Sequence, residues 1–280
     1  MSRSDGWRVH VTHETRFDYN APARASYNEL RLTPRTERHQ TALETKVVTV
    51  PAAPQYAYVD YWGTHVVAFN VDRGHEVLTI TGTALMDTQQ PEAPEDASWD
   101  DVADASFTMA DHLAHAVYTA PDAELAAIAT SLRAARPLET ARRIMVRAHE
   151  SLRYMRGVTG VHTSAHEAFV DGAGVCQDFA HLALSMTRSV GLPSRYVSGY
   201  LHPETDAVIG EEITGESHAW VEVWTGTWWG YDPTNDCAVG ERHVAIGRGR
   251  DYADVPPVKG IYAGNAEHTM HVDVRIKRTN

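Results

Sequence analysis

The chain has 280 residues, and its 25 lysines and arginines against 37 aspartates and glutamates give a formal net charge of −12. A hydrophobic content of 43% supplies enough apolar side chains for a folded core and excludes an intrinsically disordered chain. The acidic excess argues against nucleic acid as a partner, because proteins that bind phosphate backbones usually carry a basic face.

Two cysteines, Cys176 and Cys237, cannot form the disulfide framework that stabilises small secreted domains. The N-terminal residues lack the apolar segment of a secretory signal, and no stretch approaches the ~18 consecutive apolar residues of a membrane-spanning helix. These observations predict a cytoplasmic protein that does not engage a membrane.

Short alternating apolar stretches dominate residues 7–86, as at Val9 and Val11. Alternation with a period of two places one set of side chains on a buried face. Turns rich in proline, glycine and asparagine separate these stretches. The pattern predicts an N-terminal antiparallel β domain, a sandwich or barrel, over residues 1–90.

Residues 88–101 combine proline and acidic side chains with little apolar content, which indicates an exposed connection. We therefore expect a linker over residues 91–105 and a second domain over 106–280. Apolar residues at helical spacing predict helices over 122–135 and 138–152.

A third apolar pattern predicts a buried helix over 176–190, which Gly191 and Pro193 terminate. Strands are expected over the three ranges 195–201, 218–224 and 228–231, the last two joined by a tight turn. Strict alternation over 270–276 predicts a closing strand.

Cys176 opens the predicted buried helix directly after a glycine-containing segment. Unpaired backbone N–H groups and the positive end of the helix dipole gather at such a position and favour a thiolate. Gly172 and Gly174, just before it, are expected to allow a close backbone approach that delivers Cys176 to a cleft. Cys237 lies past this region and is expected to take no part.

His218 begins a predicted strand, and Asp232 ends its hairpin partner. Adjacent antiparallel strands can bring two such side chains together. A cysteine nucleophile needs a base for its proton, and the base needs an acceptor that fixes its tautomer. Cys176, His218 and Asp232 are therefore the candidate catalytic residues.

Three blocks of the second half resemble the transglutaminase-like superfamily of papain-related cysteine enzymes; they read GAGVCQDFAHLALSMTRSVGLPSRYVSGYL, SHAWVEVW and WWGYDPTND. Residues 27–35 resemble the N-terminal domain signature of a bacterial branch of that superfamily, and residues 243–257 resemble its C-terminal stretch. The resemblance implies an α+β fold in which an N-terminal antiparallel β domain precedes a papain-like core, where a helix packs on an antiparallel sheet.

The resemblance also implies roles. Cys176 would be the nucleophile, His218 the general base and acid, and Asp232 the group that orients the imidazole. The activity implied is acyl transfer from an amide through a thioester, without a cofactor. Hydrolysis by a protease, amidase or deamidase is the default outcome for a peptide or protein substrate, and transfer to an amine is the other. A binding or assembly module that keeps the fold without turnover is the alternative from a different class.

Four further residues are candidates for oxyanion or substrate contacts. The backbone N–H of Cys176 is the natural first oxyanion donor, and Gln177 or Tyr200 is a candidate for the second. Asp178 is expected to be a first-turn carboxylate favoured by the helix dipole. The alternative hypothesis is that its side chain contacts the substrate. Trp220 is expected to belong to the core or to line the cleft. The histidines lack the spacing of a metal motif, so no metal is expected.

Overall fold

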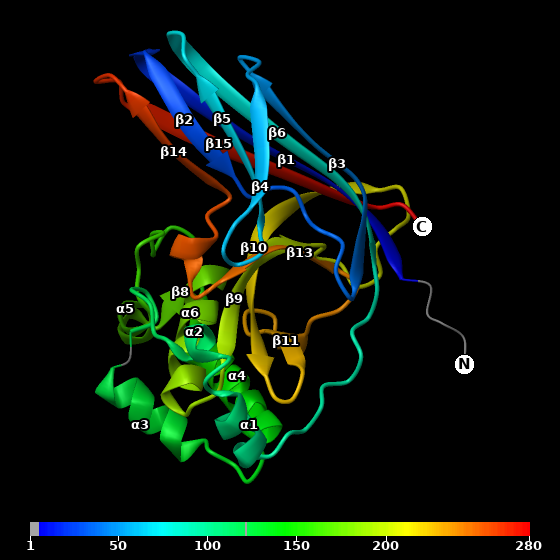
Figure 1. The fold of residues 1–280 in the computed structure, drawn as a ribbon, viewed down its shortest axis with the longest axis vertical. Helices are drawn as coiled ribbons and strands as arrows, with labels where there is room; N and C mark the ends of the chain where they lie inside the picture. The colour runs from blue at the N-terminus through cyan, green and yellow to red at the C-terminus, as the bar shows by residue number, and fades with distance from the viewer. Residues whose placement is uncertain (1–5, 121) are drawn as a thin grey trace.

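Two antiparallel sheets and a layer of helices make up the computed structural model, which describes residues 6–120 and 122–280 (Figure 1). The nine strands of the larger sheet are β1 (Trp7–Ala23), β3 (Gln40–Val50), β6 (His75–Thr88), β9 (Ser194–Leu201), β10 (Glu212–Trp224), β11 (Trp228–Asp232), β12 (Cys237–Ala238), β13 (His243–Gly249) and β15 (His268–Arg278). The four strands of the smaller sheet are β2 (Ala25–Leu30), β4 (Gln55–Val59), β5 (His65–Val71) and β14 (Val258–Ala263). A short parallel pair joins β7 (Arg153–Tyr154) and β8 (Ala173–Gly174).

The N-terminal region is antiparallel, as its sequence pattern predicts. Buried and less buried side chains alternate along β6, so that Leu78 and Ile80 are fully buried. They pack in one cluster with Leu30, Phe69 and Val71 from the smaller sheet. Alternation along each strand therefore creates the core between the two sheets.

Strands from the end of the chain complete both sheets. β15 pairs with β1 from Val9 opposite Arg278 to Tyr19 opposite His268, and it also pairs with the first residues of β10. β14 pairs with β2 along its length. The red C-terminal strands thus lie among the blue N-terminal ones in Figure 1. The closing strand expected over 270–276 lies within β15 and links the N-terminal strands to the core sheet.

The helices are α1 (Trp99–Ala105), α2 (Ala110–Leu113), α3 (Ala123–Ser131), α4 (Pro137–Ser151), α5 (Ala165–Asp171) and α6 (Cys176–Ser189), with a 3₁₀ turn η1 (Tyr252–Asp254). The three helices expected over 122–135, 138–152 and 176–190 are present as α3, α4 and α6. α6 is buried along almost its whole length, because helices α3, α4 and α5 and strands β9 and β10 pack around it. Among the described residues, no helix is long and apolar enough to cross a membrane.

The expected linker is shorter than predicted, because α1 begins at Trp99. The Ser98 hydroxyl accepts the N–H of Asp101 at 3.1 Å, and the Asp101 carboxylate accepts the N–H of Ser98 at 2.7 Å. This capping box starts a helix, and Val102 is buried in its first turns. Between β6 and α1, residues 89–98 form a connection without helix or strand.

Candidate active site

The first residue of α6 is Cys176, a partly buried free cysteine. The Asp178 carboxylate starts this helix by accepting the N–H of Val175 at 2.8 Å and the Thr159 hydroxyl at 2.7 Å. Gly174 is required here, because a Cβ at this position would lie 2.6–2.9 Å from the Asp178 side chain. The tight approach fixes the thiol at the positive end of a 14-residue helix.

His218 and Asp232 meet at the open end of the β10–β11 hairpin. His218 Nε2 lies 2.7 Å from Asp232 Oδ2, and the two side chains are 10% and 0% exposed. Burial alone would lower the pKa of His218, but the hydrogen bond with Asp232 and the attraction of Asp232 and Cys176 raise it to about 10. The structure therefore brings together all three residues predicted to be catalytic, and the imidazolium is favoured at neutral pH.

Four donors hold the Asp232 carboxylate. Oδ1 accepts the backbone N–H groups of Thr234 at 2.9 Å and Asn235 at 3.2 Å. Oδ2 accepts from His218 and from the Asn235 side-chain amide, both at 2.7 Å. Burial favours the neutral acid, but these hydrogen bonds, led by that of His218, hold the pKa of Asp232 well below its usual range.

Sequence reasoning did not assign a role to Asn235 or to His243. Asn235 follows Asp232 by three residues, so the preference of Asp for turns that cap following N–H groups could have indicated it. His243 Nε2 lies 3.5 Å from Asp232 Oδ2 and is almost fully buried. No sequence spacing connects His243 to Asp232, because a turn and the short strand β12 separate them.

The four additional candidates lie in different places. Gln177 is buried, and its amide donates to the Val161 carbonyl at 3.2 Å. Asp178 is 1% exposed and starts the helix, which is the role expected of a first-turn carboxylate. Trp220 is 1% exposed, and its ring centroid lies 6.3 Å from that of His218. It therefore supports the base from the core.

Tyr200, considered as the second oxyanion donor, makes its contacts with the N-terminal region. Its hydroxyl lies 2.9 Å from His13 Nδ1, and its ring is buried in the cluster that contains Trp7 and Val244. Side chains alternate along a strand, so Tyr200 faces the N-terminal strands. No sequence pattern distinguishes the two faces of a strand that is buried on both, as β9 is.

Two adjoining hollows open at the candidate triad. One, of about 480 Å³, is lined by His218, Asn235 and Leu201 among others. The other, of about 410 Å³, is lined by Cys176, Val272 and Asp273 among others. Both share Tyr154, Arg156 and Glu216, and Arg156 forms an ion pair with Glu216. A substrate could therefore extend to either side of the thiol and the imidazole.

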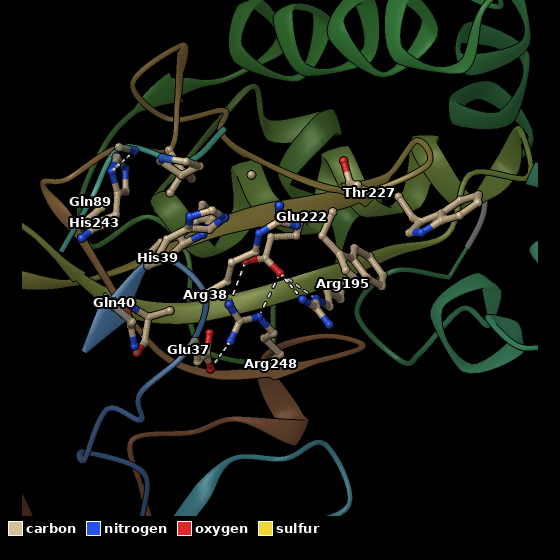
Figure 2. A pocket seen from close by; sticks show the side chains of 18 of the residues that line it. Glu37, Arg38, His39, Gln40, Gln89, Arg195, Glu222, Thr227, His243 and Arg248 are labelled. Atoms are coloured by element: carbon tan, nitrogen blue, oxygen red, sulfur yellow. Dashed lines mark hydrogen bonds and ion pairs between the residues drawn. The ribbon is translucent and has the colours of Figure 1, made fainter. Parts of the chain in front are cut away.

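A further cavity, of about 370 Å³, borders β10 and is shown in Figure 2. Glu222 in its wall accepts from Arg195 Nε at 2.6 Å and from Arg248 Nε and Nη2 at 2.9 Å. Arg248 Nη1 also donates to Glu37 at 2.7 Å. Burial alone would raise the pKa of Glu222, but the two guanidinium groups hold it well below its usual range. Buried, paired charges thus join β9, β10 and β13 to the N-terminal region.

One cluster has metal-binding residue types. Ligand atoms of Asp232, Cys237 and His243 lie within 4.8 Å of one another. Gly240 N–H donates to His243 Nδ1 at 3.2 Å, so the proton of the neutral ring is on Nε2, the nitrogen near Asp232. A protonated nitrogen has no lone pair for a metal, and Nδ1 is already occupied. His243 is therefore better suited to donate its Nε2–H than to bind a metal ion.

The fold and the site together define a family: the chain belongs to the transglutaminase-like superfamily. The superfamily profile matches residues 126–233, which contain the thiol, the imidazole and the carboxylate. The profile of the bacterial transglutaminase-like N-terminal region matches residues 9–87.

Relatives match nearly the whole chain. The uncharacterized protein ML0607 of Mycobacterium leprae (strain TN) is 43% identical over 280 residues, which cover 97% of this chain and 99% of the relative. The uncharacterized protein Rv2569c of Mycobacterium tuberculosis (strain H37Rv) is 35% identical over 291 residues, with 96% and 91% covered. A solved structure from Cytophaga hutchinsonii, described as a candidate cysteine protease, has a TM-score of 0.76 at 22% identity and covers 98% of this chain and 91% of that one. This last likeness shows the fold.

Proposed function

We propose that this protein is a cysteine-dependent enzyme that cleaves amide bonds through a thioester intermediate, with hydrolysis as the outcome. The observation that carries the proposal is the position of His218, which contacts Asp232 at 2.7 Å and has its pKa raised by the neighbouring Cys176 as well as by Asp232. A thiol at a helix start, an imidazole beside it and a buried carboxylate fill the roles of nucleophile, acid–base group and orienting group.

The proposed reaction begins with attack of the Cys176 sulfur on the substrate carbonyl carbon. The negative charge that develops on the carbonyl oxygen is stabilised by the backbone N–H of Cys176 at the start of α6. The C–N bond then breaks, and the His218 imidazolium gives its proton to the leaving nitrogen. In the second half, neutral His218 takes a proton from water, which attacks the thioester, releases the acid and restores the thiol.

The default outcome is hydrolysis, because water is always present, and transfer requires a site that holds an amine and keeps water out. The hollows of about 480 and 410 Å³ beside the triad suit a peptide or protein segment on either side of the scissile bond. Transfer of the acyl group to an amine would use the same thioester and the same residues. A binding module that lacks turnover is the remaining alternative.

A peptide library analysed by mass spectrometry tests the proposal, with and without an added primary amine. Gain of the amine with loss of ammonia indicates transfer, gain of water with loss of ammonia indicates deamidation, and new termini indicate proteolysis. Cys176→Ala should abolish every change, whereas Cys237→Ala, the matched control at the other cysteine, should leave it intact. Products that persist in folded Cys176→Ala protein would contradict the proposal.

A further inference from the structure

His243 contacts the candidate catalytic carboxylate from the start of β13. Its Nε2 lies 3.5 Å from Asp232 Oδ2, the oxygen that also accepts the hydrogen bond from His218. The side chains of His243 and Asp232 are 1% and 0% exposed, so bulk water does not screen this contact. Asp232 is thus in contact with two histidine rings, whose centroids are 6.4 Å apart.

The hydrogen bond at the other nitrogen of His243 fixes its tautomer. The N–H of Gly240 donates to Nδ1, so Nδ1 carries no proton and Nε2 carries the proton of the neutral ring. Burial lowers the pKa of His243, and repulsion from His218 and Arg242 lowers it further. The attraction of Asp232 acts in the opposite direction but does not outweigh these effects. The ring therefore stays neutral and directs an N–H dipole at Asp232.

Packing prevents the His243 ring from leaving this position. Trp220 contacts it edge to face, with ring centroids 5.2 Å apart and an interplanar angle of 75°. The main chain of His243 pairs with Leu201 on β9. The donor is therefore held on two sides by the core sheet.

We propose that His243 is a positioning residue: its Nε2–H holds the Asp232 carboxylate in the orientation in which Oδ2 accepts from His218. Backbone N–H groups of Thr234 and Asn235 hold Oδ1, and the Asn235 amide holds Oδ2. The buried Nε2 of His243 has no hydrogen-bond partner among the described residues and lies 3.5 Å from Oδ2, so this oxygen is the acceptor within its reach. Restraint of both oxygens opposes rotation of the carboxylate, which would turn Oδ2 away from the base. The inference rests on the proposed function, since it concerns the same triad, and His243 acts only through Asp232.

The first test is spectroscopic and needs no substrate. In histidine-labelled wild-type protein, ¹⁵N NMR should assign the His243 proton to Nε2 at pH 7. Asp232→Asn should shift the Nε2–H resonance of His243, and Asn28→Asp, a polar change far along the chain, should not. A proton on Nδ1, or a charged ring at pH 7, would overturn the inference.

The second test is kinetic. His243→Ala should slow iodoacetamide modification of Cys176 and lower kcat about tenfold while KM stays within about twofold, because one contact to a charged group is lost. His243→Gln, which can place an amide N–H near the position of Nε2, should recover most of that loss. In an Asp232→Ala background, His243→Ala should have no further effect, because its partner is gone.

The third test uses the cavity of about 370 Å³, which His243 lines together with Arg195 and Glu222 (Figure 2). Removal of the ring in His243→Ala leaves space continuous with this cavity, so imidazole from solution should enter and restore the rate of Cys176 modification in a saturable manner. His243→Phe, which fills the space without a donor, should not respond to imidazole.

The outcomes separate the two proposals. If wild-type Cys176 is not modified selectively over Cys237, the proposed function fails, whatever the NMR result. If Cys176 is selectively reactive and folded His243→Ala matches the wild type in kcat and modification rate, the positioning role fails. Should His243→Ala not fold, His243→Gln and the wild-type NMR assignment still decide the question.

Discussion

His218 and Asp232 are diagonal neighbours across the β10–β11 hairpin rather than directly opposed. Backbone pairing of the hairpin ends with Val221 opposite Tyr231. Continuation of that register would place Asp232 opposite Trp220, yet His218 Nε2 reaches Asp232 Oδ2 at 2.7 Å. The two catalytic candidates therefore meet beyond the end of the ladder, where the strands no longer hydrogen bond and a substrate can reach the imidazole.

The first prediction concerns the triad. Cys176→Ala should reduce turnover to background while the fold persists, because the atom that forms the thioester is gone. His218→Ala should do the same, and the double variant should cost nothing further, because the two residues act as a unit. Asp232→Asn should leave reduced activity, since the base remains but is less well oriented. Circular dichroism checks the fold, and additive losses in the double variant would contradict this mechanism.

The second prediction concerns pH. The pKa of His218 is raised from 6.5 to about 10 in the folded protein, so its contribution to the free energy of unfolding is complete below about pH 6.5 and is lost as the pH rises towards 10. The difference in unfolding free energy between wild type and His218→Gln, from urea titrations, should therefore shrink over this window. A constant difference from pH 6 to 10 would contradict the raised pKa.

The third prediction concerns the buried ion pairs. Glu222→Ala leaves the guanidinium groups of Arg195 and Arg248 buried without their shared partner, and it should lower the free energy of unfolding by about 3–5 kcal/mol. Asp87→Asn breaks the exposed ion pair with Arg8 and is the matched control, with little expected effect. Equal losses for the two variants in urea titrations would mean that burial does not govern this network.

The fourth prediction concerns the connection over residues 89–98. A glutamate-specific protease should cut the native protein first at Glu92 or Glu95, which lie in this segment without helix or strand. The two fragments should still elute together in size-exclusion chromatography, because β15 pairs with β1 and β14 with β2 across the cut. Separation of the fragments under native conditions would contradict the shared sheets, and first cuts within 160–235 would contradict a rigid core.

Much of the fold could be predicted from local patterns. Alternation indicated the N-terminal strands, and the apolar stripe with a Gly191 stop indicated α6, because these signals depend on neighbours in the sequence. Local patterns could not show that β15 lies beside β1, since the register between strands so far apart is set by packing of the two sheets. The start of α1 was missed although Ser98 and Asp101 form a local capping-box pattern, because the proline-rich and acidic composition of the segment indicated a connection.

The same distinction between local and long-range features applies to the candidate site. Cys176, His218 and Asp232 could be predicted because each residue type has a recognised role, and because Cys176 starts α6 and Asp232 ends β11. His218 was expected to begin its strand and instead lies within β10, which starts at Glu212. Asp178 accepts the Val175 N–H in the first turn of α6, as expected, whereas the contact of the Tyr200 hydroxyl with His13 could not be predicted from the sequence. His243 was missed because only the folded turn around Gly240 brings it to the carboxylate.

The pairing of β15 with β1 and of β14 with β2 also bears on synthesis of the chain. Until residues 258–278 have left the ribosome, β1 and β2 each lack one neighbour and present open edges. The N-terminal sheets therefore cannot close co-translationally, and the nascent chain exposes strand edges that can join other chains. Ribosome-bound chains that stop before residue 258 should accordingly require a chaperone to remain soluble, whereas released full-length chains should not.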